Sequence, residues 1–450
     1  MSVPANTLLT MNGNGPDGIA HPGARSGPVA FYAPLKSPDS PRPSGDRLIA
    51  RALFAALEAA DLRPVLVSRL RTLDLAGDRA TQRTLEAQAA AQADAMIAKW
   101  QACPHEQRPR AFVTYHLYYK APDLIGPRVA RALAIPHVVV EASISDKRRD
   151  GPWAPWLAVV IDAVAHADLV VHINPKDAPA IATHRPPDRP TATVPPFRDL
   201  TAFTNAYAAR ATHRHDVRQR LGLSDETCVL MSAGMMRPGA KMRSYATLAA
   251  ALTTLETQRT RVRPPGRPPW HVLIAGDGAC AADVRAAFEA LAPHVTFLGQ
   301  LDEAAMAVAM AGADRFVWPA IDEALGMVFI EAQAAGLPVI AADRPGVRDL
   351  IAMEHRAHQP PEADAEALAR ALTAALRAPT VQADAASAQA HRHACAHHSL
   401  AGGGAAFAAL VHDAIARGTL AAAGQPERER KHEHHGRSGG RPTTSTAEAP

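Results

Sequence analysis

The chain has 450 residues, of which 47% are hydrophobic and 20% are charged, and its formal net charge is +4. This length and hydrophobic content are sufficient for two folded domains. The basic residues are spread along the sequence, which argues against a nucleic-acid-binding protein. The polar N-terminus has no signal-peptide pattern, and no apolar run reaches the roughly 18 residues of a membrane span. We therefore expect a cytoplasmic protein that touches the inner face of a membrane at most peripherally.

The cysteines and histidines do not form a metal-binding pattern. The cysteines lie far apart, at Cys103, Cys228, Cys280 and Cys395, and we interpret them as buried or incidental thiols in a reducing compartment. The histidines of 391–398 and 432–435 have no carboxylate or cysteine pattern beside them that completes a site. We expect a solvated helix and tail there, and no metal.

Strands and helices alternate in the first half of the chain. The predicted strands are 28–33, 65–68, 111–116, 137–141 and 169–173. The predicted helices are 48–57, 78–103, 123–134 and 153–166, the first of them capped by Ser44 or Asp46. This alternation indicates a parallel sheet with helices on both faces.

The same alternation resumes after a Pro-rich stretch at 185–198. The predicted strands of the second half are 228–233, 270–275, 295–298, 315–318 and 338–342, and the predicted helices are 243–254, 302–311, 327–335, 364–377 and a helical segment within 383–417. We divide the chain into a disordered N-terminus 1–27, a first domain 28–198, a linker 199–224, a second domain 225–380, C-terminal helices 381–417 and a disordered tail 418–450.

One stretch of the second half carries a specific frame. Glu323 follows the strand 315–318, and Glu331 lies seven intervening residues later in the next helix. The surrounding positions are Pro319, Gly326, Ala332, Gly336, Pro338, Val339 and Gly346. This frame resembles the Glu-x7-Glu motif of retaining glycosyltransferases with the GT-B fold, family 4 in particular.

The resemblance covers residues 28 to about 415 and implies the fold and the reaction. It implies an α/β protein with two Rossmann-like, doubly wound domains that face each other across a cleft, and a last helix, placed at 399–416, that crosses back onto the first domain. It further implies a retaining hexosyltransferase that uses a nucleoside-diphosphate sugar. The acceptor would be a glycan, a lipid or a small molecule. The chain has no Asp-x-Asp motif, in agreement with a mechanism without metal or cofactor.

The resemblance also assigns residues to the donor. Arg237 and Lys241 resemble the Arg and Lys that grip the diphosphate, although Met235 stands where the family has its Arg and the Lys comes one residue late. The helix that begins near Gly326 and Met327 offers N–H groups to the phosphate or sugar. The resemblance places Glu331 at the ribose and Glu323 nearer the transferred hexose.

On the first domain, His116 matches the second His of a family His-x-His that contacts the hexose, with Thr114 in place of the first. Gly45 resembles the family's Gly-rich acceptor loop. Glu141 lies where the family often has Thr-x-His, so no family role carries over, and we expect it at the acceptor because it ends a predicted strand. The basic run 147–149 is either a solvated loop or a contact for an anionic acceptor or lipid headgroups.

Two other functions remain open at this point. The first is another sugar-nucleotide enzyme of the same fold, such as an epimerase, because fold alone does not determine the reaction. The second is a non-catalytic nucleotide-sugar-binding partner, which the departures at Met235 and Glu141 allow. A dinucleotide dehydrogenase is disfavoured because no predicted strand leads into Gly-x-Gly-x-x-Gly.

Overall fold

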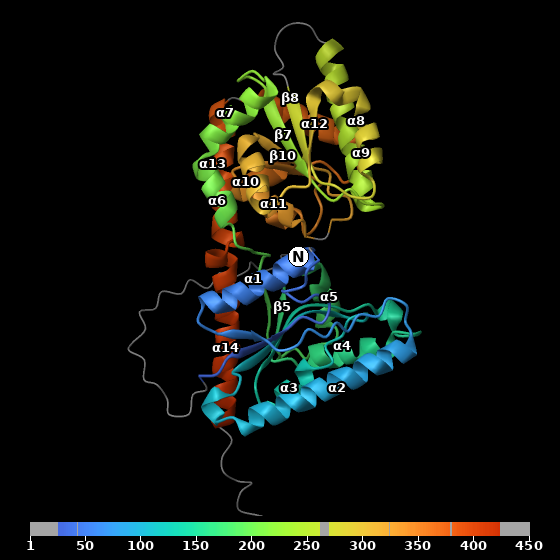
Figure 1. The fold of residues 1–450 in the computed structure, drawn as a ribbon, viewed down its shortest axis with the longest axis vertical. Helices are drawn as coiled ribbons and strands as arrows, with labels where there is room; N and C mark the ends of the chain where they lie inside the picture. The colour runs from blue at the N-terminus through green and yellow to red at the C-terminus, as the bar shows by residue number, and fades with distance from the viewer. Residues whose placement is uncertain (1–25, 43, 262–269, 324, 379, 424–450) are drawn as a thin grey trace, which may run out of the picture.

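In the computed structural model the described residues, which are 26–42, 44–261, 270–323, 325–378 and 380–423, form two parallel sheets flanked by helices (Figure 1). This arrangement confirms the predicted α/β class. The segments 1–25 and 424–450, which hold most of the residues predicted to be disordered, lie outside the described residues.

The first sheet has the strand order β2-β1-β3-β4-β5-β6, and all its neighbouring strands are parallel. Its strands are β1 (Val29–Tyr32), β2 (Pro64–Leu66), β3 (Ala111–Tyr118), β4 (His137–Ser143), β5 (Leu169–His172) and β6 (Thr191–Thr193). Its helices are α1 (Gly45–Ala59), α2 (Arg79–Ala102), α3 (Gly126–Leu133), α4 (Ala154–His166) and α5 (Ala178–Ala182). The central strands β3 and β4 are mostly apolar and are buried along most of their length, because helices cover both faces of the sheet.

The second sheet has the order β11-β10-β7-β8-β9, again with parallel neighbours. Its strands are β7 (Cys228–Ala233), β8 (Trp270–Ala275), β9 (Val295–Gly299), β10 (Arg315–Trp318) and β11 (Val339–Ala341). Its helices are α8 (Ala240–Arg261), α9 (Ala281–Ala287), α10 (Glu303–Gly312), α11 (Met327–Ala334) and α12 (Ala365–Arg377). Short 3₁₀ turns occur at His105–Gln107, Asp146–Arg148, Pro175–Asp177, Glu289–His294, Arg348–Leu350 and Met353–His358.

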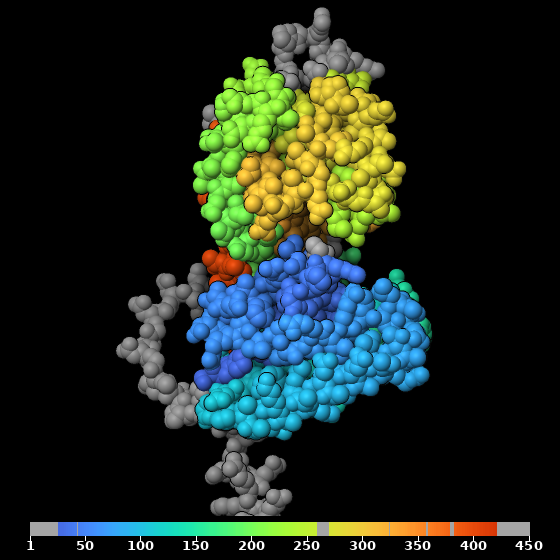
Figure 2. Space-filling model, viewed as in Figure 1, coloured from blue at the N-terminus to red at the C-terminus, as the bar shows by residue number. Residues whose placement is uncertain are grey.

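Two segments connect the domains. The first enters the second domain through α6 (Thr201–Ala208) and α7 (Arg210–Leu221), which pack against α10. The second returns through α13 (Thr380–His398), a π-helical turn (Leu400–Gly404) and α14 (Ala405–Ala423). Figure 1 shows α13 beside the second domain and α14 beside the first, where α14 packs against α1 and β3. The space-filling view shows two lobes that meet at a narrow waist (Figure 2).

Several sequence predictions need correction. The Pro-rich stretch 185–198 contains the short edge strand β6, which was not predicted, and the segment 199–224, predicted to be a polar linker with a helix, forms two helices docked on the second domain. Helix α14 continues to Ala423, into the segment predicted to be disordered. His398 on α13 is buried rather than solvated, because its ring packs at the crossing between the domains and bonds the carbonyl of Pro196.

Helix α1 illustrates how the sequence determines an element that faces the second domain (Figure 1). The Ser44 hydroxyl accepts the backbone N–H of Arg47 at 3.2 Å and so caps the first turn. Apolar side chains recur at helical spacing on the buried face, namely Ile49, Ala50, Ala52, Leu53, Ala56 and Leu57. The cap and the apolar face determine where Asp46, in the exposed first turn, meets β3.

Candidate functional site

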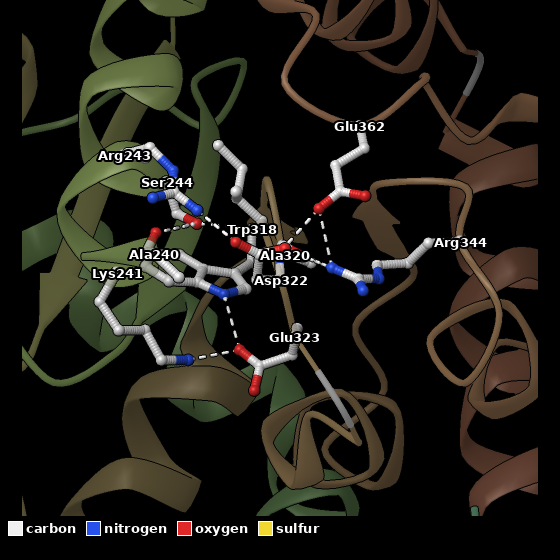
Figure 3. Close-up of polar contacts among 11 residues, drawn as sticks. Ala240, Lys241, Arg243, Ser244, Trp318, Ala320, Asp322, Glu323, Arg344 and Glu362 are labelled. Atoms are coloured by element: carbon white, nitrogen blue, oxygen red, sulfur yellow. Dashed lines mark hydrogen bonds and ion pairs between the residues drawn. The ribbon is translucent and has the colours of Figure 1, made fainter. Parts of the chain in front are cut away.

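Lys241 and Glu323 form an ion pair at the carboxyl ends of β7 and β10 (Figure 3). The Nζ of Lys241 donates to Oε2 of Glu323, and Nε1 of Trp318 approaches the same oxygen at 3.4 Å. The ammonium also lies 5.1 Å from the centroid of the Trp318 ring. Both charged side chains are less than one-fifth exposed. Two residues that the sequence assigned to the donor are therefore in direct contact.

The position of Lys241 differs from the prediction. It lies in the first turn of α8, whereas we expected it in the loop before the helix, because α8 begins at Ala240. Arg237 remains in that loop, where it is exposed, and no described residue bonds its side chain. Met235 is 59% exposed in the same loop. The structure thus brings Lys241, but not Arg237, to the carboxylate.

The loop after β10 holds Glu323 in a constrained conformation. Ala320 and Asp322 both have positive φ, 55° and 50°, which non-glycine residues seldom adopt. Their neighbours fix them, because Glu362 accepts the N–H of Asp322 at 2.7 Å and the carboxylate of Asp322 pairs with Arg243 (Figure 3). Such strained backbone persists where surrounding contacts determine it, and it is frequent at ligand-binding loops.

Gly326 begins α11 in a left-handed conformation, with φ of 51°. A Cβ atom at this position would lie 2.4 Å from the ring of Phe329, so a side chain is excluded both by the backbone angle and by space. Met327 is the first helical residue and is buried. The first N–H groups of a helix have no acceptor within the helix, so this end of α11 can bind an anion next to Glu323.

Glu331 lies one helical turn before the end of α11 and contacts Arg198, which precedes α6. The Nη1 of Arg198 donates to Oε1 of Glu331, and Nη2 donates to Glu303 of α10. Burial raises the pKa of the Glu331 carboxyl, and the Arg198 guanidinium opposes this rise. The two glutamates of the motif therefore have different partners, a lysine for Glu323 and an arginine for Glu331.

Sequence reasoning missed Arg198. It follows a Pro-rich stretch that was interpreted only as a domain boundary, and its partners Glu303 and Glu331 lie more than 100 residues away. No local pattern connects positions at that separation.

His116 and Glu141 are neighbours on the first sheet. We predicted that each ends its strand, but β3 and β4 continue to Tyr118 and Ser143. Both residues have φ of 59°, and the strand pairing omits them and resumes with Leu117 opposite Ala142. The backbone is thus distorted at one residue on each strand while the register of the two strands stays the same, which explains why the two polar residues interrupt apolar runs without ending them.

Each of these two side chains has a partner. Nδ1 of His116 lies 2.9 Å from Oδ1 of Asp46, and this hydrogen bond is the main reason that the pKa of Asp46 is lowered. Oε2 of Glu141 accepts the backbone N–H groups of Ile173 and Asn174 at 2.7 and 3.0 Å. Burial raises the pKa of Glu141, and these bonds oppose the rise.

Gly45 is the first residue of α1, directly before Asp46. It is exposed, and no atom lies within 4 Å of the position of an added Cβ. A ligand can therefore approach the backbone at this end of α1 next to the Asp46–His116 pair.

Within the described ranges, no group of three or more His, Cys, Asp and Glu residues has an arrangement that could hold a metal ion. Nor is any helix among those described both long and apolar enough to span a bilayer. The polar groups at the two sheet ends are instead suited to an anionic ligand with hydroxyl groups. Lys241 and the α11 amides can neutralise phosphate, and the carboxylates can accept hydroxyl hydrogens.

Known proteins share both the fold and the second domain. Residues 239–392 match the family model described as Glycosyl transferases group 1. Sucrose-phosphate synthase from Thermosynechococcus elongatus superposes with a TM-score of 0.59 at 20% identity, over 88% of this chain and 100% of that one. This likeness confirms the predicted GT-B fold.

The sequence of the chain is similar to those of curated proteins, including two glycosyltransferases. Phosphatidyl-myo-inositol mannosyltransferase of Mycobacterium leprae is 41% identical over 108 residues, which are 24% of this chain and 29% of the relative. D-inositol 3-phosphate glycosyltransferase of Jonesia denitrificans is 36% identical over 165 residues, 35% of this chain and 37% of the relative. The matched stretches thus cover less than two-fifths of either relative. The chain thus has the GT-B fold, and its residues 239–392 are similar to the glycosyl transferases group 1 domain.

Proposed function

We propose that this protein is a retaining, metal-independent glycosyltransferase that moves a hexosyl group from a nucleoside-diphosphate sugar to an acceptor hydroxyl. The contact between Lys241 and Glu323 is the observation that carries this proposal. It puts a cation, a carboxylate and the N-terminus of α11 at one place, at the carboxyl ends of the strands, where open parallel sheets bind ligands.

Each group has a role in the proposed reaction. Lys241 and the amides that begin at Met327 neutralise the leaving diphosphate, which otherwise requires a metal ion. Glu323 stabilises the positive charge that develops on the sugar in an oxocarbenium-like transition state. Glu331 accepts the ribose hydroxyls. His116, which lies on the first domain and is hydrogen-bonded to Asp46 of the same domain, contacts the hexose from the side opposite Glu323.

We further propose an acceptor that binds on the first domain near Gly45 and Glu141. The names of the two curated relatives favour an inositol phosphate or a phosphatidylinositol among the glycan, lipid and small-molecule acceptors. With a lipid acceptor, the reaction takes place at the cytoplasmic face of a membrane that the protein touches peripherally.

The test has two stages. Thermal shifts with UDP-, GDP- and ADP-sugars first identify the donor, since a bound ligand stabilises the folded state. The selected donor is then incubated with inositol phosphate, with phosphatidylinositol vesicles and with simple glycans, and the products are analysed by mass spectrometry and NMR. A glycoside with the anomeric configuration of the donor is expected. A free epimer of the sugar, or binding without turnover, contradicts the proposal.

A further inference from the structure

The segment between β6 and α6 carries one arginine, Arg198, whose side chain enters the second domain. Its guanidinium donates to Glu331 of α11 and to Glu303 of α10, and the side chain is 9% exposed. The ring of Phe203 lies 5.3 Å from the guanidinium carbon. Arg198 is therefore a buried cation with two carboxylate partners.

The backbone of Arg198 is fixed as well. Its N–H donates to the carbonyl of His398 at 2.9 Å, and it forms a β-bridge with Ser399, where the chain returns to the first domain. Its Nε donates to the carbonyl of Asp199 at 3.0 Å. Because both the backbone and the guanidinium of this arginine are already fixed, it loses little conformational entropy when it orients a ligand-binding group.

The fixed position of Arg198 determines the environment of the Glu331 carboxylate. An isolated carboxylate is costly to bury, so an ionised Glu331 needs a compensating donor. Arg198 is this donor and binds Oε1 of Glu331, and no described residue donates a hydrogen bond to Oε2 of Glu331. Oε2 is thus the acceptor that remains for a ligand, and its direction depends on the hydrogen bond at Oε1.

We infer that Arg198 is a positioning residue for the ribose of the donor, because it holds Oε1 of Glu331 and so fixes the orientation of the second oxygen, Oε2. The inference rests on the proposed function. It makes the preference for a ribonucleotide over a 2′-deoxynucleotide depend on a residue of the interdomain segment that does not itself touch the ligand.

The experiment measures this preference by calorimetry on the full chain. UDP, ADP and GDP are compared with dUDP, dADP and dGDP, and the pair with the tightest ribonucleotide is used throughout. The variants are Glu331→Gln, Arg198→Met and Arg218→Met. Arg218 is the matched control because it is also a buried arginine bonded to a carboxylate, Asp314, but lies on α7 away from the motif.

We expect the wild-type protein to bind the ribonucleotide about tenfold more tightly than the deoxynucleotide, as for one lost hydrogen bond to a charged group. This ratio falls to within about twofold in Glu331→Gln and in Arg198→Met and stays at the wild-type value in Arg218→Met. A purely structural role of Arg198 lowers both affinities equally, so an unchanged ratio in a folded Arg198→Met overturns the inference while the proposed function stands.

If Arg198→Met does not fold, Glu303→Gln carries the test, because it removes the second anchor of the guanidinium and leaves Arg198 in place. A ratio reduced to about threefold supports the inference, and a wild-type ratio overturns it. If the wild-type protein binds none of the six nucleotides, the proposed function and this inference both fail.

Discussion

Lys241, in the first turn of α8, and Glu323, in the loop after β10, form an ion pair at one end of the second sheet and neutralise each other. A bound diphosphate must compete with Glu323 for the Lys241 ammonium. In the proposed reaction, the carboxylate therefore acts against the phosphate in the ground state and in favour of the sugar at the transition state.

This relationship predicts opposite effects of one substitution. Glu323→Gln frees Lys241 and removes a negative charge beside the phosphate, so nucleoside diphosphate binding should become about three- to tenfold tighter. At the same time kcat should fall by about 10²–10³, because the charge that stabilises the transition state is lost. Calorimetry and steady-state kinetics measure the two effects. Unchanged kcat in a folded variant would remove Glu323 from the reaction.

Lys241→Ala should weaken binding of the diphosphate by roughly 10–100-fold while binding of the bare nucleoside changes little. Arg237→Ala should have a smaller effect of the same kind, because its side chain is exposed and unbound in the described structure. The double variant Lys241→Ala/Glu323→Gln should bind diphosphate better than Lys241→Ala alone, since the unpaired carboxylate is gone. Equal losses for nucleoside and diphosphate would contradict a phosphate role for Lys241.

Glu331→Ala should raise KM for the donor by roughly 10–150-fold and change kcat little. The proposed ribose contact is the same before and during the reaction, so its loss removes binding that is uniform between the ground and transition states. Circular dichroism confirms that the variant folds, and steady-state kinetics compare it with Glu323→Gln. The prediction is wrong if Glu331→Ala lowers kcat and leaves KM unchanged.

Turnover should continue in EDTA. In the proposed mechanism Lys241 and the N-terminus of α11 supply the positive charge for the diphosphate in place of a metal ion, and the sequence has no Asp-x-Asp motif. Activity is measured after dialysis against the chelator, with and without added Mg²⁺ or Mn²⁺. Loss of turnover that either ion restores would require a metal-dependent mechanism.

The buried carboxyl of Glu141 should make the free energy of unfolding depend on pH. Burial raises the pKa of its carboxyl above the ordinary value of 4.5. Between that value and the raised pKa, the folded protein retains a proton that the unfolded chain has lost, so the free energy of unfolding decreases as the pH rises. Glu141→Gln lacks this contribution, and its Tm relative to the wild type should increase from pH 4.5 to 7.5. A difference in Tm that is constant over this range would contradict the prediction.

The sequence predicted the elements better than the contacts between them. Strands β8 and β10 match their predicted bounds to the residue, because each is a short, mostly apolar run next to glycine or proline. The positive φ angles of His116 and Glu141 could not be predicted, since each residue lies inside a strand that continues on both sides of it, and glutamate is not among the residue types enriched at positive φ. The Lys241–Glu323 contact spans 82 positions and depends on how the first turn of α8 packs against the loop after β10, which no local sequence pattern predicts.

The pairing of Arg198 with Ser399 also constrains how the two lobes can move. The chain passes between the lobes twice, and the two passages are joined there by a backbone hydrogen bond. Two connections that are joined at one point permit a hinge motion of the lobes and oppose a twisting or sliding motion of one lobe against the other. We therefore expect the two lobes to open and close by the same hinge motion each time. A substrate bound to one lobe then returns to the same position opposite the other lobe.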